Sequence, residues 1–318
     1  MQNLDAAKIL RPAIHRFLTL LSFSFAALAE NPAGELVTDR PDQTESSVLV
    51  APGYVQIETG VAFTDEGRES RGYEVMGTLI RAGLTKRLEL RLGFGGWVRE
   101  LEEPGNSGLA DTELGLKLYL WEERGLRPEA ALLGHVSLPS GEEGHSTERP
   151  DPSFRLAFSH TLSERVGLGY NIGVSWETTE ELVRPAGLWA LGQRRAESLV
   201  EDLIEGALDG RVPGSIRGRL ADEANGYLFP ERFDRDTQAT LNYTATTGIG
   251  LTQRMGMFLE LFGDVPLNAP GPPRHYADGG VTFLLRENVQ LDIAGGAGLN
   301  AAAADWFIGA GISVRFSR

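Results

Sequence analysis

Residues 306–316 read WFIGAGISVRF, and the residues alternate in character along the whole stretch. An extended strand points successive side chains to opposite faces, so a period of two sorts residues by face. One face of this stretch carries apolar side chains, and the other carries Phe307, two glycines, a serine and an arginine. The stretch is therefore typical of a β-strand with one apolar face and one small or polar face.

The same alternation recurs along most of the chain upstream of this stretch. Clear copies occupy residues 54–64, 88–99, 112–120, 166–176 and 289–294. Weaker copies occupy residues 73–84, 128–138, 153–162, 237–249, 255–265 and 276–285. The sequence thus predicts about twelve strands of about ten residues each, the length at which a tilted strand crosses a bilayer.

The connections between these predicted strands alternate between short and long. Short polar turns lie at residues 85–87, 163–165, 252–254 and 286–288. Longer connections lie at residues 65–72, 100–108, 139–152, 177–236, 266–275 and 300–305. Up-and-down outer-membrane barrels have short periplasmic turns and longer extracellular loops, whereas a soluble β-sandwich has no reason to sort its loops in this way. We expect an all-β, antiparallel transmembrane barrel of about 12 strands with both chain ends on the periplasmic side.

Composition excludes several classes of protein. The formal net charge of -14 argues against nucleic-acid binding, which needs a clustered excess of Lys and Arg. The absence of Cys excludes disulfides, thiol chemistry and Cys-ligated metals. Glycine accounts for 39 of 318 residues, well above the usual share of about 7%. Much of it falls on the small or polar faces of the predicted strands, where it would ease curvature and leave room in a narrow interior.

The amino terminus has the pattern of a secretory signal peptide. Lys8, Arg11 and Arg16 precede the apolar run at residues 17–29, which is too short to span a bilayer and ends in Ala-Leu-Ala. The alternative is a buried amphipathic helix, but the run is apolar on all sides. We expect cleavage before Glu30, a periplasmic segment at residues 30–53 and a barrel at residues 54–318.

In a membrane barrel the apolar face meets lipid and the other face lines the lumen. Five aromatic residues near predicted strand ends suit the two interfacial girdles, namely Tyr170, Trp176, Tyr243, Trp306 and Phe316. The predicted lumen face carries nine acids and six bases, a mixture that favours paired charges over a strongly selective pore. They are Glu58, Arg81, Glu89, Arg91, Arg99, Asp111, Glu113, Lys117, Glu129, Arg155, Glu260, Asp264, Asp278, Asp292 and Arg315. Twelve of these residues, all except Glu129, Asp264 and Asp278, are the candidates for a solute path.

Several motifs resemble one family of bacterial outer-membrane proteins, labelled as transporters or as proteins of the meta-cleavage pathway of phenol degradation. The motifs are VTDRPDQTES at residues 37–46, APGY at residues 51–54 with the strand VQIETGVAF after it, LTKRLELRLGFGGW at residues 84–97, GLADTELGLKLYL at residues 108–120, MFLELFG at residues 257–263, GGVTFLLRENVQLDIAGGAGLN at residues 279–300 and DWFIGAGISVRF at residues 305–316. The resemblance implies an outer-membrane barrel. Its label carries little weight for the identity of a substrate.

The chain departs from this family in two places. Phe316 is followed by Ser317 and Arg318, whereas barrels usually end on the aromatic residue that the assembly machinery reads. Residues 177–236 form a longer insertion than the family suggests, and apolar residues recur at helical spacing within residues 193–209. As an amphipathic helix, this part could cover the external mouth, enter the lumen or bind a partner. The alternative is a surface loop.

A charged stretch precedes the first predicted strand. Asp39, Arg40, Asp42 and Glu45 could fold back to pair with lumen charges at the periplasmic mouth, or form a polar leader strand. We favour the first interpretation, because Pro52 and Gly53 would hold the stretch beside the barrel opening.

Catalysis has little support in the sequence. Barrel phospholipases carry a Ser/His site on the lipid face, whereas His135 and Ser137 share the predicted lumen face, and no G-x-S-x-G or H-E-x-x-H motif is present. His145 and His275 fall in predicted loops and His160 near a strand end. We therefore expect no enzyme, metal or cofactor.

These features together predict a protein of the bacterial outer membrane. The expected partners are membrane lipid, the barrel-assembly machinery and an unidentified small solute, and nucleic acid is not among them. The expected role is passive passage or binding of small solutes, including hydrophobic or aromatic ones. The alternative is a structural or interaction protein with a closed lumen, and a phospholipase-type enzyme ranks last.

Overall fold

The computed structural model describes residues 34–67, 71–101, 105–142, 144–147, 149–182 and 233–317. The chain divides into the units Met1–Gly34 and Glu35–Arg318, and everything below concerns the second. The predicted signal peptide at residues 1–29 and the predicted helix at residues 193–209 lie outside the described residues.

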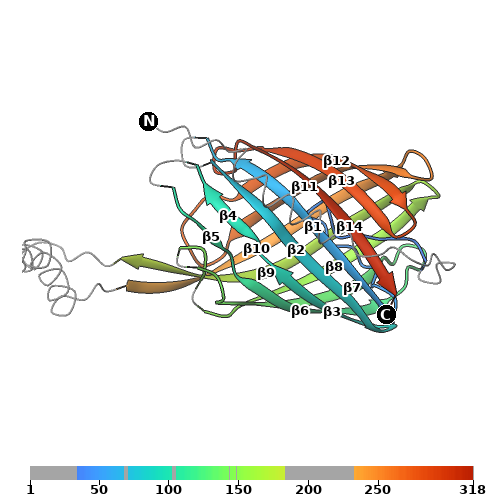
Figure 1. Cartoon of the computed structure of the whole chain (residues 1–318), viewed down its shortest axis with the longest axis horizontal. Helices are drawn as coiled ribbons and strands as arrows, with labels where there is room; N and C mark the ends of the chain where they lie inside the picture. The colour runs from blue at the N-terminus through green and yellow to red at the C-terminus, as the bar shows by residue number, and fades with distance from the viewer. Residues whose placement is uncertain are drawn as a thin grey trace, which may run out of the picture. The chain divides into compact units, whose positions relative to one another are not determined.

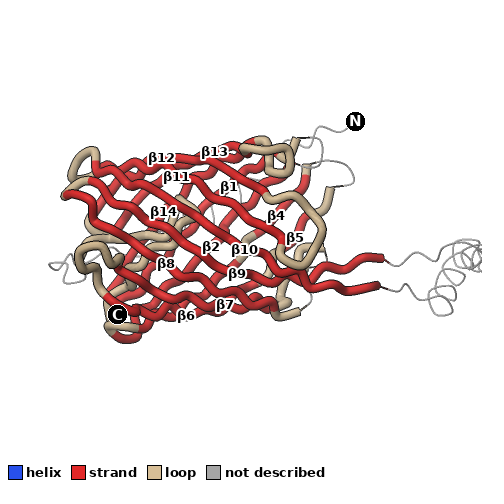
Figure 2. The backbone as a smooth tube through the Cα atoms, turned by 180° about the vertical axis from the view of Figure 1, so that it is seen from behind, coloured by secondary structure: helices blue, strands red, loops and turns tan. Residues whose placement is uncertain are grey.

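The described part of the chain is built from strands joined by turns and loops, as Figures 1 and 2 show. Among the described residues, no helix is long and apolar enough to cross a membrane. The strands are β1 (Tyr54–Asp65), β2 (Arg71–Thr85), β3 (Leu88–Phe94), β4 (Trp97–Glu100), β5 (Ser107–Leu109), β6 (Thr112–Trp121), β7 (Glu129–Leu138), β8 (Asp151–Ser163), β9 (Val166–Leu182), β10 (Phe233–Gly250), β11 (Met255–Pro266), β12 (Arg274–Arg286), β13 (Val289–Gly298) and β14 (Trp306–Ser317).

The sheet closes on itself into an antiparallel barrel. β1 pairs with β14 from Tyr54 opposite Ser317 to Asp65 opposite Trp306, and it also pairs with β2. β3 and β4 both pair with β2, so they form one strand interrupted at Gly95 and Gly96. β5 and β6 likewise form one interrupted strand, because β4 pairs with β5 and β3 pairs with β6. We call each continuous or interrupted strand a stave; the described residues form twelve staves, which confirms the predicted barrel.

Alternation along each stave produces the inverted faces that a membrane barrel needs. On β6, Leu114, Leu116 and Leu118 are exposed, whereas Lys117 between them is fully buried. Apolar side chains that would form the core of a soluble protein point outward here, and charged side chains point inward. The interior of this barrel is therefore polar.

The connections sort to the two ends of the barrel as expected. β9 and β10 extend beyond the other strands at the long-loop end, as Figure 2 shows. Their ladder runs to Leu182 opposite Phe233, so residues 177–182 and 233–236 are strand. The expectation that the loop begins at residue 177 and ends at residue 236 is therefore wrong, because the hairpin continues past the other staves.

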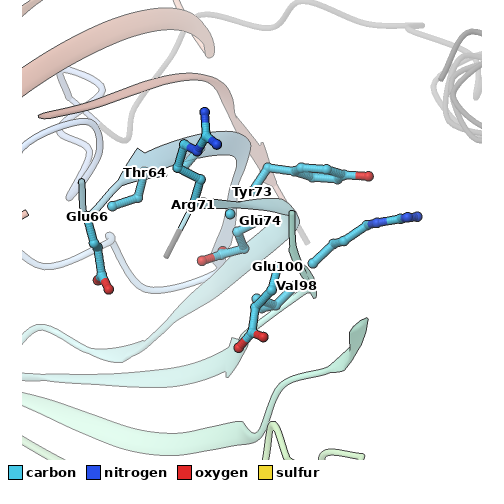
Figure 3. A pocket seen from close by; sticks show the side chains of 10 residues that line it. Thr64, Glu66, Arg71, Tyr73, Glu74, Val98 and Glu100 are labelled. Atoms are coloured by element: carbon cyan, nitrogen blue, oxygen red, sulfur yellow. The ribbon is translucent and has the colours of Figure 1, made fainter. Parts of the chain in front are cut away.

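A local break changes the face of one predicted lumen residue. Met76 and Gly96 both adopt positive φ, of 65° and 72°, and the inward-outward alternation shifts by one residue at this point. Arg99 consequently pairs with Tyr73, whose ring points away from the Glu74 and Glu100 side chains in Figure 3. The prediction that Arg99 lies in the lumen assumes one uninterrupted strand at residues 88–99. The structure puts Arg99 on the outer face instead.

A plugged lumen as the candidate functional site

Residues 35–50 lie inside the barrel, and we call them the plug segment. They belong to no strand, and they contact the lumen wall through side chains and their own backbone. In the described part of the chain, hydrogen bonds or ion pairs join the plug segment to every stave except β12. The polar lumen face is thus the surface on which this segment folds.

Arg81 of β2 lies at the centre of one side of this contact. Its side chain is fully buried, and its Nη1 and Nε atoms lie 3.0 Å and 2.9 Å from the Glu58 and Glu89 carboxylates. Its guanidinium also donates to the plug-segment carbonyls of Val37 and Val48. A buried charge is stable only when it is paired and hydrogen-bonded, and Arg81 meets both conditions.

Asp39 is the main acid that the plug segment contributes. Its Oδ2 atom lies 2.6 Å from Arg91 Nη1, 3.0 Å from Arg81 Nη1 and 3.2 Å from Lys117 Nζ. Its backbone N–H donates to Glu58 Oε2 at 3.0 Å. Burial alone would raise the pKa of Asp39, but Arg81, Lys117 and Arg91 together hold that pKa well below its ordinary value. Asp39 is therefore an anion that binds three staves to the plug segment.

Glu45 and Thr44 extend the contact to other parts of the wall. The Glu45 carboxylate accepts from Arg91 Nη2 at 2.8 Å, and its backbone N–H donates to Asn171 Oδ1 at 2.7 Å. Thr44 Oγ1 lies 2.7 Å from Thr244 Oγ1 and also donates to Glu260. The contacts thus continue around the interior from β3 to β11.

Arg40 lies in a slot between two glycines. Its Nη2 atom is 3.1 Å from Asp292 Oδ1. Gly60 and Gly311 face each other across β1 and β14, and a Cβ on either glycine would lie 2.6 Å from Arg40 Nη2. These two glycines therefore serve the plug segment directly, because any side chain there would occupy the space of the guanidinium.

The remaining predicted lumen residues fall into three groups. Arg315 and Glu129 bind the plug segment, Arg315 through the Glu35 carbonyl and Glu129 through Ser47. Asp278 is buried, and its carboxylate has no hydrogen-bond partner among the described residues. Glu113 and Arg155 are more open to the lumen, and Asp264 is bound by Arg274 Nε at 2.8 Å.

Asp111 lies outside the strands and holds a loop. Its carboxylate accepts from the backbone N–H groups of Ser140, Gly141 and Thr147 at 2.8 to 3.0 Å. Partial burial acts to raise the pKa of Asp111, but hydrogen bonds from Thr147, Ser146 and Gly141 outweigh it and lower the pKa. The sequence predicts Asp111 as a lumen residue, and in the structure its carboxylate, at the break between β5 and β6, is bound by the β7–β8 loop.

His135 has a structural contact that accounts for its position. Its Nε2 atom accepts a hydrogen bond from Arg91 Nε at 3.0 Å, and its ring covers Gly115. Among the described residues, no group of three or more His, Asp or Glu side chains could hold a metal ion.

Two cavities lie at the long-loop end, and one of them borders the plug segment. One, of ≈ 250 Å³, is lined by residues of β1, β2 and β4, including Thr64, Tyr73, Glu74 and Val98, which Figure 3 shows. The other, of ≈ 140 Å³, lies between Gln43 of the plug segment and β8, β10, β11 and β12. The described lumen thus holds small pockets around a filled centre.

Sequence reasoning missed the neutral part of this site. Gln56, Asn171, Thr244 and Gln290 bind the plug segment as the charged residues do. A count of charges along each predicted strand leaves out neutral donors and acceptors on the same face. The alternation itself would have found them, because they occupy lumen positions of their strands.

Comparisons with known proteins agree with this architecture. Residues 38–203 and 215–316 match the model of the family described as "Putative MetA-pathway of phenol degradation". A solved COG4313 outer membrane channel from Pseudomonas putida F1 covers 87% of this chain and 100% of its own, with 11% identity and a TM-score of 0.56. The NanC porin covers 82% and 98%, with 6% identity and a TM-score of 0.46. No curated protein matches the sequence significantly.

Proposed function

The chain belongs to the family described as "Putative MetA-pathway of phenol degradation", and from this premise we propose that it is a passive outer-membrane channel whose lumen the plug segment closes. As in other outer-membrane barrels, the short turns then face the periplasm and the long loops face the exterior. Its surroundings are then membrane lipid on the outer face and a small solute in the lumen, with the barrel-assembly machinery inserting it. The polar, charge-paired interior supports a path for solutes.

One observation carries this proposal: the plug segment is held by side-chain hydrogen bonds and ion pairs and does not pair as a strand in the sheet. The barrel closes through β1 and β14 without it. Its release would therefore leave every ladder of the sheet intact. In contrast, a lumen filled by residues of the staves themselves could open only if the barrel changed shape.

The test compares the full chain with a variant that lacks residues 35–48, both reconstituted in planar bilayers and in liposomes. We expect the shortened barrel to conduct ions continuously and to admit sugars, amino acids and small aromatic compounds in a swelling assay. We expect the full chain to conduct only in brief openings. An absence of conductance from both proteins would contradict the proposal and favour a closed interaction protein.

A further inference from the structure

The ≈ 140 Å³ cavity lies on the long-loop side of the plug segment, where a solute from outside would meet it first. Its wall includes Phe262 and Tyr276, whose rings stack with centroids 4.8 Å apart. Phe307 stands edge-on to both rings, at 6.0 Å and 6.4 Å. We call the rings of Phe262 and Tyr276, which line the cavity and against which Phe307 packs, the aromatic wall. A cavity of about 150 Å³ holds one benzene molecule, so this one is the size of a single ring.

A guanidinium lines the same cavity. Arg155 of β8 is half-buried and donates from Nη1 to the Gln43 carbonyl at 3.3 Å. Among the described residues it has no ion pair within 4.0 Å, unlike Arg81 and Arg91. Arginine offers a planar fork of donors that matches a carboxylate, so most of the hydrogen-bonding capacity of Arg155 remains available to a ligand.

The acids near Arg155 are either neutralised or held at a distance. Asp264, which also lines the cavity, accepts from Arg274 Nε through both oxygens at 2.8 Å. Glu45 is ion-paired with Arg91 at 2.8 Å. Glu113 interacts with Arg155 only across a longer distance. The neutral donors Asn242 and Thr244 complete the polar side of the cavity.

From this arrangement we infer that the cavity is a subsite for a monocyclic aromatic carboxylate, with its ring against the aromatic wall and its carboxylate on Arg155. The inference rests on the proposed channel function and names the class of solute that the channel would select. A neutral aromatic alcohol of the same size fills the cavity but leaves the guanidinium without an anion. An aromatic amine places a cation against Arg155.

The experiment measures equilibrium binding to the detergent-solubilised full chain by calorimetry, with benzoate, benzyl alcohol, benzylamine and acetate as probes. We expect benzoate to bind about tenfold or more tightly than benzyl alcohol, since one charge-assisted hydrogen bond is worth at least that factor. Benzylamine and acetate should bind most weakly, because benzylamine meets the guanidinium and acetate lacks a ring.

Variants separate the contribution of the Arg155 charge to binding from that of the aromatic wall. Arg155→Gln should reduce benzoate affinity to the level of benzyl alcohol and leave benzyl alcohol unchanged, and Arg155→Lys should restore part of the difference. Phe262→Leu should weaken both aromatic probes. Arg165→Gln, in the exposed β8–β9 turn, is the matched control and should change nothing.

The binding measurements do not depend on whether solutes pass through the barrel. A protein that binds benzoate in this pattern but does not conduct refutes the channel and retains the subsite. Equal affinity of the wild type and Arg155→Gln for benzoate, or tightest binding of benzylamine, overturns the subsite while the conductance measurements stand.

Discussion

A single guanidinium shows how residues of the wall and the plug segment depend on each other. Arg40 occupies space that Gly60 and Gly311 leave open, and it reaches Asp292 from there. Glycine at these positions thus has a specific steric role beyond easing the curvature of the wall. Removing that space displaces the side chain that holds this part of the plug segment.

Gly311→Ala should weaken retention of the plug segment. The new Cβ would lie 2.6 Å from Arg40 Nη2, so the guanidinium must shift from the position in which it reaches Asp292. We expect a loss of about 2 kcal/mol, the worth of a hydrogen bond between charged groups, and more frequent channel openings in planar bilayers. Gly248→Ala is the matched control, because a Cβ there meets nothing within 4 Å. Equal opening frequencies in the two variants would show that the space at Gly311 does not help to hold the plug segment.

Arg81→Met should destabilise the whole protein. The substitution leaves Glu58, Glu89 and Asp39 without their shared buried base. Breaking a buried ion pair costs about 3 to 5 kcal/mol, and urea unfolding in detergent micelles measures the loss. Arg165→Met, on an exposed turn, should stay within about 0.5 kcal/mol of the wild type. A similarly small effect for Arg81→Met would show that its carboxylate partners are stable without it.

At the scale of elements, the plug segment carries two acids whose pKa values are shifted in opposite directions. Burial, Glu260 and Asp39 raise the pKa of Asp42 well above its ordinary value, whereas Asp39 itself stays ionised. An acid whose pKa is raised in the plugged state binds its proton more tightly there than after release. Its contribution to plug retention is therefore complete at low pH and is lost as the pH rises through the raised pKa.

The channel should accordingly open more often as the pH rises from the ordinary carboxyl range through the raised pKa of Asp42, because Asp39, whose pKa is lowered, keeps its charge throughout. Single-channel recordings across this range measure the opening frequency. Asp42→Asn should reduce the pH dependence, because the amide does not titrate, and leave the part that comes from Glu45, whose pKa burial also raises. A wild-type opening frequency that falls with rising pH would contradict the assignment.

The β7–β8 loop depends on Asp111 in a similar way. Asp111→Ala removes the acceptor for three backbone N–H groups of that loop, so limited proteolysis within residues 139–150 should accelerate. The lowered pKa of Asp111 means that its protection is present above the ordinary pKa and lost as the pH falls through the lowered one. Glu142→Ala removes a charge from the same loop and serves as the control. An unchanged cleavage rate in Asp111→Ala would show that Asp111 does not hold the β7–β8 loop.

The staves could be predicted from period-two alternation because lipid and lumen impose opposite demands on successive residues. The alternation fails at Gly95 and Gly96, where a positive-φ break shifts the faces, and so it misplaces Arg99. Only the charge density of the plug segment indicated that it folds back to the lumen. Its partners on β2, β3, β9 and β11 could not be paired with it, since barrel closure brings together residues far apart in sequence.

At the scale of the whole molecule, the protein is a closed barrel with a separable filling. The ladders from β1 round to β14 hold the wall, and the plug segment is bound to that wall by hydrogen bonds, ion pairs and buried apolar residues such as Leu36 and Val50, without a strand ladder. A channel with this construction can open without unfolding. The central claim is that the plug segment must leave the lumen wall before solutes pass.

A reversible tether tests this claim most directly, and the Cys-free chain makes the tether specific. Thr44 Oγ1 lies 2.7 Å from Thr244 Oγ1, so the pair Thr44→Cys and Thr244→Cys places two sulfur atoms within reach of a disulfide. The measurement is single-channel current from this double variant in one bilayer, before and after a reductant is added. The account predicts a closed channel while the disulfide is intact and openings once it has been reduced. Identical currents before and after reduction would contradict it.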